Sequence, residues 1–177
     1  MSQFSGRAKK TAWTAWSLLP EVTHTFSTIP HSLKPTEYDI SVIERFVVFM
    51  YDQTCPDFTV NGCRKYLFTK LGRLIENCPP TLDALTQHIN RAILQSSIWV
   101  ESLYNTTSLD ITNFGWSLDQ ECFAQPVWCT LQKSSAVCKE LKRCKCTTKC
   151  ISGRCTCKKF GLSCSDLCLC GGNCYAK

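Results

Sequence analysis

The chain has 177 residues, which is enough for one ordinary domain or for a small domain joined to a metal-held module. Hydrophobic residues make up 44% of it and charged residues 19%, so the composition allows a packed core and argues against wholesale disorder, and no apolar run is long enough to predict a membrane span. The net charge is +6, and cysteine, with 15 residues, is the most unusual feature of the composition.

Residues 1–35 are predicted to form an N-terminal helix followed by a linker. Apolar residues recur at helical spacing from Ala8 to Leu19, and Pro20 ends the run. The next stretch, 27–36, contains two prolines and has the composition of a linker.

Residues 36–137 are predicted to form a mainly α-helical domain. Thr36 to Asp39 fits a capping box with aspartate in place of glutamate, and it opens a helix that runs to about Tyr51. This helix is apolar nearly all round, so we expect it to be the central buried helix of the domain.

Two more helices are predicted in this domain. The first covers about 60–71, with Cys63 and Leu67 turned inward. The second starts at Pro79-Pro80-Thr81 and runs to about Ser97. Its apolar stripe consists of Leu82, Leu85, Ile89, Ala92 and Ile93. Loop composition follows over 100–120, then a short extended piece at 127–129 and a short helix over 134–141.

No catalytic constellation is visible in this part of the chain, so we do not expect an enzyme. The three histidines are scattered, and His88, beside the apolar stripe, is better explained as a structural residue because a catalytic base needs a positioned partner. Five cysteines show no ligand spacing and are predicted to be small buried hydrophobic residues. They are Cys55, Cys63, Cys78, Cys122 and Cys129.

The remaining residues, 138–177, are predicted to form a cysteine-rich CXC zinc-binding module. They hold nine basic and two acidic residues, a charge of +7, whereas residues 1–137 sum to −1. A compact basic module is what electrostatic attraction to phosphate requires. The alternative is that these lysines only keep the segment soluble or offset thiolate charge. The predicted nucleic-acid contacts are Lys142, Arg143, Lys145, Lys149, Arg154, Lys158 and Lys159.

Nine cysteines in 31 residues, three C-x-C pairs among them, are the predicted metal ligands. They are Cys144, Cys146, Cys150, Cys155, Cys157, Cys164, Cys168, Cys170 and Cys174. Zinc takes four tetrahedral ligands and thiolate suits it well. If three of the nine thiolates each bridge two ions, the ligand bonds number twelve, which satisfies three Zn²⁺.

Disulfides are the alternative use of these cysteines. The total is odd, the first ten residues carry no apolar signal-peptide core, and ten of the 15 cysteines fall in the last 40 residues. In a reducing compartment this pattern favours metal. Large apolar residues are few here, so folding is expected to depend on zinc. Which cysteines bridge, and whether Cys138 replaces one of the nine, stays open.

At these residues the tail resembles the CXC domain of the tesmin type. Related arrangements of nine cysteines and three zinc ions occur in the pre-SET segment of histone methyltransferases and in the CXC domain of the male-specific-lethal dosage-compensation ligase. Two spacings, before Cys150 and before Cys174, differ from the tesmin pattern by one residue. Arg154 stands where that pattern has a tyrosine that enters the DNA minor groove. The resemblance implies a zinc-dependent DNA-binding module.

The whole chain also resembles an uncharacterised group of animal proteins that are often multi-copy and tied to mobile elements. The matching pieces are Gly6 to Trp13, Glu44 to Val48, Met50 to Asp52, Pro79 to Thr81, His88 to Ala92, Gly115-Trp116 and the cysteine tail. In that group the first piece looks like the glycine- and lysine-bearing turn of flap-endonuclease-like proteins, which grips a phosphate backbone. The resemblance implies that this chain is the C-terminal part of a longer, nuclease-like protein.

Two functions of different classes therefore follow from the sequence. The first is a nuclear zinc protein that binds DNA or chromatin through its basic tail. The second is a protein-interaction or structural module whose zinc cluster only holds its shape, with a protein as its partner. Neither a membrane nor a small-molecule substrate is expected as a partner.

Overall fold

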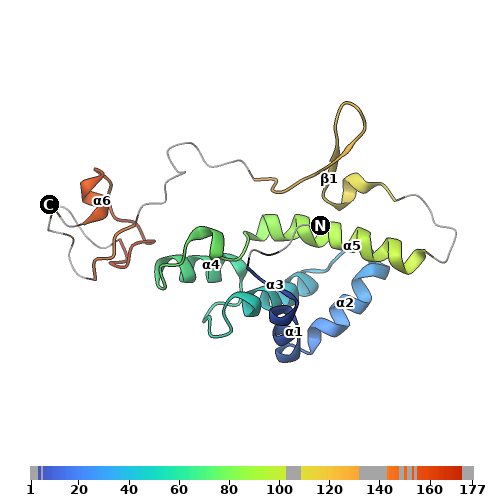
Figure 1. The fold of residues 1–177 in the computed structure, drawn as a ribbon, viewed down its shortest axis with the longest axis horizontal. Helices are drawn as coiled ribbons and strands as arrows, with labels where there is room; N and C mark the ends of the chain where they lie inside the picture. The colour runs from blue at the N-terminus through green and yellow to red at the C-terminus, as the bar shows by residue number, and fades with distance from the viewer. Residues whose placement is uncertain are drawn as a thin grey trace. The chain divides into compact units, whose positions relative to one another are not determined.

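The structure is a computed structural model that describes residues 4, 6–102, 109–131, 143–147, 150, 153 and 155–172 (Figure 1). The chain divides into two compact units. We call Met1–Cys63 with Pro79–Gln132 the helical unit, and Arg64–Cys78 with Lys133–Lys177 the cysteine unit.

Helices dominate the described residues, as the sequence predicts. The α helices are α1 (Lys9–Leu18), α2 (Glu21–Ser32), α3 (Glu37–Tyr51), α4 (Val60–Thr69), α5 (Leu82–Glu101) and α6 (Thr156–Lys159). The 3-10 turns are η1 (Ile75–Asn77) and η2 (Ile111–Phe114), and the strands are β1 (Trp116–Leu118) and β2 (Ala124–Pro126).

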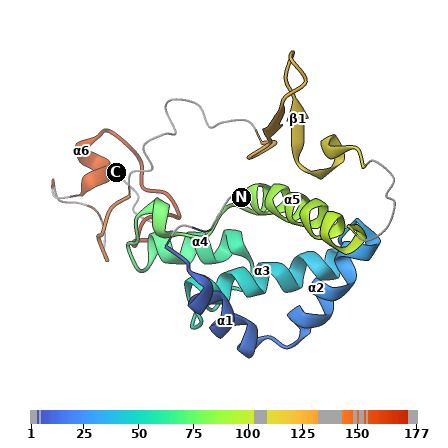
Figure 2. The same cartoon turned by 45° about the vertical axis from the view of Figure 1, so that its right-hand side comes forward.

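The centre of the helical unit is α3. It packs against α1 and α2, and α2 in turn packs against α5 (Figures 1 and 2). Val47 and Val48 are 1% and 0% exposed, and buried residues occur on most of its circumference. The prediction of a central buried helix is confirmed.

The predicted capping box at the start of α3 is also confirmed. Thr36 Oγ1 accepts a hydrogen bond from the Asp39 amide at 3.1 Å, and the Thr36 amide donates to Asp39 Oδ2 at 2.8 Å. The first backbone amides of a helix have no intrahelical partners, and the box provides hydrogen-bond acceptors for two of them.

Replacing Thr36 by alanine is expected to lower the free energy of unfolding of the helical unit by about 1 kcal/mol, because one half of the box is lost. Urea unfolding followed by circular dichroism measures the change. Ser41→Ala is the matched control, since the Ser41 hydroxyl donates to the Tyr38 carbonyl within the same helix and lies outside the box. Equal losses in the two variants would contradict the assignment.

The linker predicted over 27–36 is wrong, because α2 extends to Ser32 with Pro30 inside it. Proline removes one helical hydrogen bond, but here it lies in the last turn, where little helix follows. Val22 and Ile29 are buried against neighbouring helices, and this packing outweighs the local cost. The helix ends at Ser32, and Leu33, which caps it, has a φ of 57°.

Side chains from neighbouring segments cap the starts of α4 and α5. Glu44 is buried on α3, and its Oε1 accepts from the Val60 amide at 3.0 Å. The Leu82 amide donates to Asn61 Oδ1 at 3.0 Å. These bonds fix where the two helices begin, and a buried glutamate of this kind gives no periodic signal in the sequence.

The predicted stripe on α5 is largely correct. Leu85, Ile89 and Ile93 are buried, whereas Ala92 is exposed and Leu82 is half-buried. The buried side of α5 also includes Leu94 and Ser97, which lie outside the predicted stripe.

A two-stranded hairpin follows, where the sequence predicted a loop to residue 120 and an extended piece at 127–129. The strands β1 and β2 are antiparallel, with Trp116 opposite Pro126. Val127 follows β2; its amide donates to the Gly115 carbonyl at 3.0 Å and its carbonyl accepts from Arg91 Nη1 at 2.5 Å. The helix predicted over 134–141 lies outside the described residues.

Glycine is needed at the junction before the hairpin. Gly115 has a φ of +75°, and a Cβ atom there would lie 2.8 Å from the Gln87 backbone oxygen. Arg91 Nη1 donates to the Gly115 carbonyl at 3.2 Å, and the Arg91 guanidinium lies 5.2 Å from the Trp128 ring centroid. These contacts hold the hairpin on α5.

Candidate metal centre

Eight of the nine predicted ligands lie among the described residues, and they come together in the cysteine unit. Five of them form a buried core in which no side chain is more than 4% exposed: Cys144, Cys150, Cys155, Cys157 and Cys168. The other three, Cys146, Cys164 and Cys170, are packed against it. The ninth predicted ligand, Cys174, and the neighbouring candidate Cys138 lie outside the described residues.

Short backbone turns bring these cysteines together. Cys155 precedes α6, and the Leu162 amide donates back to the Cys157 carbonyl at 2.9 Å. The Leu169 amide donates to the Cys144 carbonyl at 3.3 Å, which joins the first and last C-x-C pairs. Alternating C-x-C side chains can then point toward neighbouring positions within one small volume.

The sulfur atoms lie at distances that suit tetrahedral metal coordination. The Cys144 sulfur is 3.6 Å from Cys150, 3.8 Å from Cys164 and 3.7 Å from Cys170. The Cys157 and Cys168 sulfurs are 3.6 Å apart. Zinc–sulfur bonds of about 2.3 Å at tetrahedral angles place two sulfurs about 3.8 Å apart. No disulfide joins any of the described cysteines, so the disulfide alternative is not realised among them.

Three groups of four cysteines can each hold one metal ion. In each group all the sulfurs lie within 4.8 Å of one another. The groups are Cys144, Cys146, Cys150 and Cys155; Cys144, Cys155, Cys157 and Cys164; and Cys144, Cys150, Cys164 and Cys170. The cysteine-rich region is therefore a compact cluster with several possible tetra-cysteine metal sites.

The thiols of the cluster differ in pKa. Burial raises the pKa of Cys144 to about 12 and raises that of Cys164 as well. A hydrogen bond from the Lys158 amide lowers the pKa of Cys155 to about 6. Cys155 is therefore more readily deprotonated than Cys144 and Cys164, and a metal ion that binds these two as thiolates must displace their protons.

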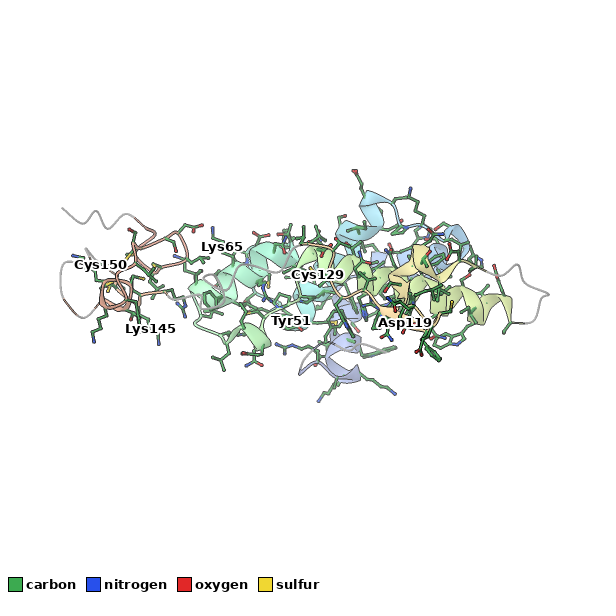
Figure 3. The ribbon with its side chains drawn as sticks, turned by 90° about the horizontal axis from the view of Figure 1, so that it is seen from above. Tyr51, Lys65, Asp119, Cys129, Lys145 and Cys150 are labelled. Carbon is green, nitrogen blue, oxygen red and sulfur yellow. The ribbon has the colours of Figure 1, made fainter. Side chains whose placement is uncertain are left out.

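Of the seven predicted nucleic-acid contacts, four are described. Lys145, Lys158 and Lys159 are exposed around the cluster (Lys145 is labelled with Cys150 in Figure 3). Arg143 is half-buried, and its Nη1 donates to the Thr69 carbonyl at 2.8 Å. The other three, Lys142, Lys149 and Arg154, lie outside the described residues.

The five cysteines outside the tail divide into two kinds. Cys55, Cys63 and Cys78 are buried, as predicted, but Cys122 and Cys129 are exposed, so the prediction is wrong for these two. Cys122 lies in the hairpin turn with a φ of 62°. The Cys129 thiol donates to Asp83 Oδ2 at 2.6 Å, together with the Thr130 amide at 2.7 Å. Sequence spacing gives no sign of this contact, because the residues are 46 positions apart.

His88 lies on α5 in the wall of an apolar cavity of about 260 Å³ in the helical unit. Its ring centroid is 5.1 Å from that of Phe4. Burial lowers its pKa, so the imidazole is neutral at pH 7. No carboxylate or thiol is among the described residues that line the cavity.

Comparison with known protein families, curated proteins and solved structures finds no match to this chain. Among the helices in the described part of the chain, none is both long enough and apolar enough to span a membrane.

Proposed function

We propose that the cysteine unit is a zinc–thiolate module that binds three Zn²⁺ and uses its basic surface to bind DNA or chromatin in the nucleus. The observation that carries the metal part is the set of sulfur–sulfur distances of 3.6–3.9 Å, which match the edge of a zinc-centred tetrahedron. An all-thiolate donor set favours zinc over magnesium or calcium, which prefer oxygen. The likeness to the tesmin-type CXC pattern supports the same assignment.

The overlap between the three groups of four supports three ions and suggests which cysteines bridge them. Every pair of groups shares Cys144 and one more cysteine, and that second cysteine is different for each pair: Cys150, Cys155 or Cys164. A triangle of three metal ions has three edges, and each edge needs one bridging thiolate. We therefore assign Cys150, Cys155 and Cys164 as the bridging ligands.

The terminal ligands then follow from position. Cys146 belongs only to the first group of four, so we assign it to the first site, and we assign Cys144, which all three groups share, to the same site. Cys157 completes the second with Cys168, whose sulfur is 3.6 Å away. Cys170 completes the third with Cys174, the remaining cysteine of the pattern. Nine thiolates and three Zn²⁺ leave a charge of −3, which the surrounding basic residues offset.

The charge distribution supports a nucleic-acid partner. The segment 138–177 carries +7 in a chain of +6, and its described lysines Lys145, Lys158 and Lys159 are all exposed. Exposed lysines that neutralise phosphates release counterions, so affinity for DNA should fall steeply with salt.

The test is a gel-shift titration of the zinc-loaded chain on duplex DNA at several salt concentrations. The double variant Lys158→Gln/Lys159→Gln is expected to lower the slope of log affinity against log salt by about 2, one unit for each lost phosphate contact. The control removes an exposed lysine of the helical unit that lies outside the Gly6 to Trp13 piece, Lys34→Gln, and should leave the slope unchanged. Affinity that is independent of salt or survives zinc removal would refute the proposal, and so would an equal loss in the control.

A protein-binding role is the second candidate, and one observation favours it. Phe160 and Leu162, beside α6, are 56% and 47% exposed, an apolar feature next to the two lysines. This role predicts no retention on DNA at physiological salt and a protein partner whose capture is lost in Phe160→Ser.

A further inference from the structure

Two side chains next to the metal ligands hold the C-terminal end of α4 and the segment that follows it. Arg143 immediately precedes Cys144, and Asp166 stands two residues before Cys168. The segment that they contact, residues 64–78, belongs to the same compact unit although it is far away in the sequence. We call Arg143 and Asp166 the α4 clasp.

Arg143 binds the end of the helix in two ways. Its Nη1 donates to the carbonyl of Thr69, the last residue of α4, at 2.8 Å. Its guanidinium carbon also lies 4.9 Å from the ring centroid of Phe68. The last carbonyls of a helix lack intrahelical partners and carry partial negative charge, so a guanidinium is well suited to them. The planar group can stack on the ring and donate at the same time.

Asp166 makes the second contact, one helical turn earlier. Its Oδ2 accepts from Lys65 Nζ at 2.6 Å (Lys65 is labelled in Figure 3). Lys65 and Thr69 are four residues apart, so the two contacts lie on the same face of α4. The ion pair is exposed and contributes little stability by itself, but together with Arg143 it specifies one orientation of the helix.

The chain after α4 is shaped around the guanidinium. Gly72 has a φ of +68°, and a Cβ atom there would lie 3.0 Å from Arg143 Nη2. The Arg73 amide donates to the Leu67 carbonyl at 3.1 Å, which closes the turn. A larger residue at position 72 would be strained and would also crowd the arginine.

We propose that metal binding by the cysteine cluster positions the α4 clasp and thereby docks residues 64–78, so that loss of the metal releases the end of α4. This inference rests on the proposed zinc cluster. The physical reason is that the clasp residues have no rigid element of their own: their positions follow from Cys144 and Cys168, which metal coordination fixes. It follows that Arg143 positions α4, and we no longer count it among the residues that contact phosphate.

Hydrogen–deuterium exchange on the full chain, with zinc loaded and after chelation, tests the inference. The amides of Lys70 and Arg73 donate to the carbonyls of Tyr66 and Leu67, so they report on this segment. We expect chelation to speed their exchange at least tenfold, while amides in α3 of the helical unit keep their rate. Native mass spectrometry of the same samples counts the metal ions.

Two variants act on the clasp without touching a cysteine. Arg143→Gln and Gly72→Ala should each speed exchange over residues 64–73 in the zinc-loaded protein while leaving the metal count unchanged. Arg143→Lys keeps the positive charge and is the matched control for charge. We expect exchange over residues 64–73 to be faster in this variant too, because a lysine lacks the planar group that stacks on Phe68. In the gel-shift assay, Arg143→Gln should leave the slope of log affinity against log salt unchanged, whereas Lys158→Gln/Lys159→Gln should lower it.

The outcomes separate this inference from the proposal on which it rests. If no zinc is bound, the proposed cluster fails and the inference fails with it. If three zinc ions are bound but exchange over residues 64–73 is the same after chelation, the inference is wrong and the cluster stands. A salt slope lowered by about one in Arg143→Gln would return that residue to the phosphate contacts.

Discussion

Cys164→Ser is expected to leave the protein with at most one of the three zinc ions that we propose it binds. The Cys164 sulfur is 3.7 Å from that of Cys150 and 3.9 Å from that of Cys155, and it belongs to two of the three groups of four. Loss of a bridging thiolate takes one ligand from two ions at once, whereas serine is a poor zinc ligand. Native mass spectrometry after reconstitution with zinc measures the number of ions retained.

Cys146→Ser is the matched control for this prediction. Cys146 belongs to one group of four and is assigned as a terminal ligand. Its loss opens a single site, so we expect two or three ions to remain, with the third exchanging more readily. If the two variants lose the same number of ions, the assignment of bridging ligands is wrong, even if three zinc ions are bound in the unaltered protein.

Local patterns explain which parts of the fold could be predicted from the sequence. The capping box and apolar surface of α3 lie within one short segment, so they can be predicted from the local sequence without knowledge of tertiary contacts. The sequence does not predict α2, because Pro30 disfavours a helix there. The packing of Val22 and Ile29 against other helices outweighs this effect, and the local sequence does not display that packing. Propensity is a weak guide wherever tertiary contacts oppose it.

The candidate site divides in the same way. The three C-x-C pairs mark the ligands because zinc sites need several cysteines at short spacing. Which of these cysteines would bridge two metal ions depends on the distances between sulfur atoms, and sequence spacing does not encode those distances. The contact of Arg143 with Thr69 joins residues 74 apart, and charge alone placed this arginine among the phosphate contacts. A charged residue next to a ligand therefore needs its neighbours in space before a role can be assigned.

Removing zinc from the full chain is expected to unfold the cysteine-rich region while the helical unit stays folded. The buried core among the described residues there consists of five cysteines, with no buried aliphatic or aromatic side chain in it. The helix α6, described in this region, has four residues, whereas isolated helices in water need about 12–15. Structural zinc in small modules contributes about 10–16 kcal/mol to folding, far more than the exposed ion pair of Asp166 can supply.

The helical unit has its own source of stability and should respond differently. Val47, Val48 and Leu85 are no more than 1% exposed, and burial of such side chains contributes about 1.5–3 kcal/mol each. On chelation, we expect the amide signals of residues 155–172 in a ¹H–¹⁵N spectrum to collapse to random-coil positions, while those of α3 and α5 stay dispersed. Readdition of zinc should restore the first set. Dispersed signals from residues 155–172 in the chelated protein would mean that contacts other than metal–thiolate bonds hold this region, because a cluster of nine unbound thiols has neither the apolar area nor the hydrogen bonds to remain folded.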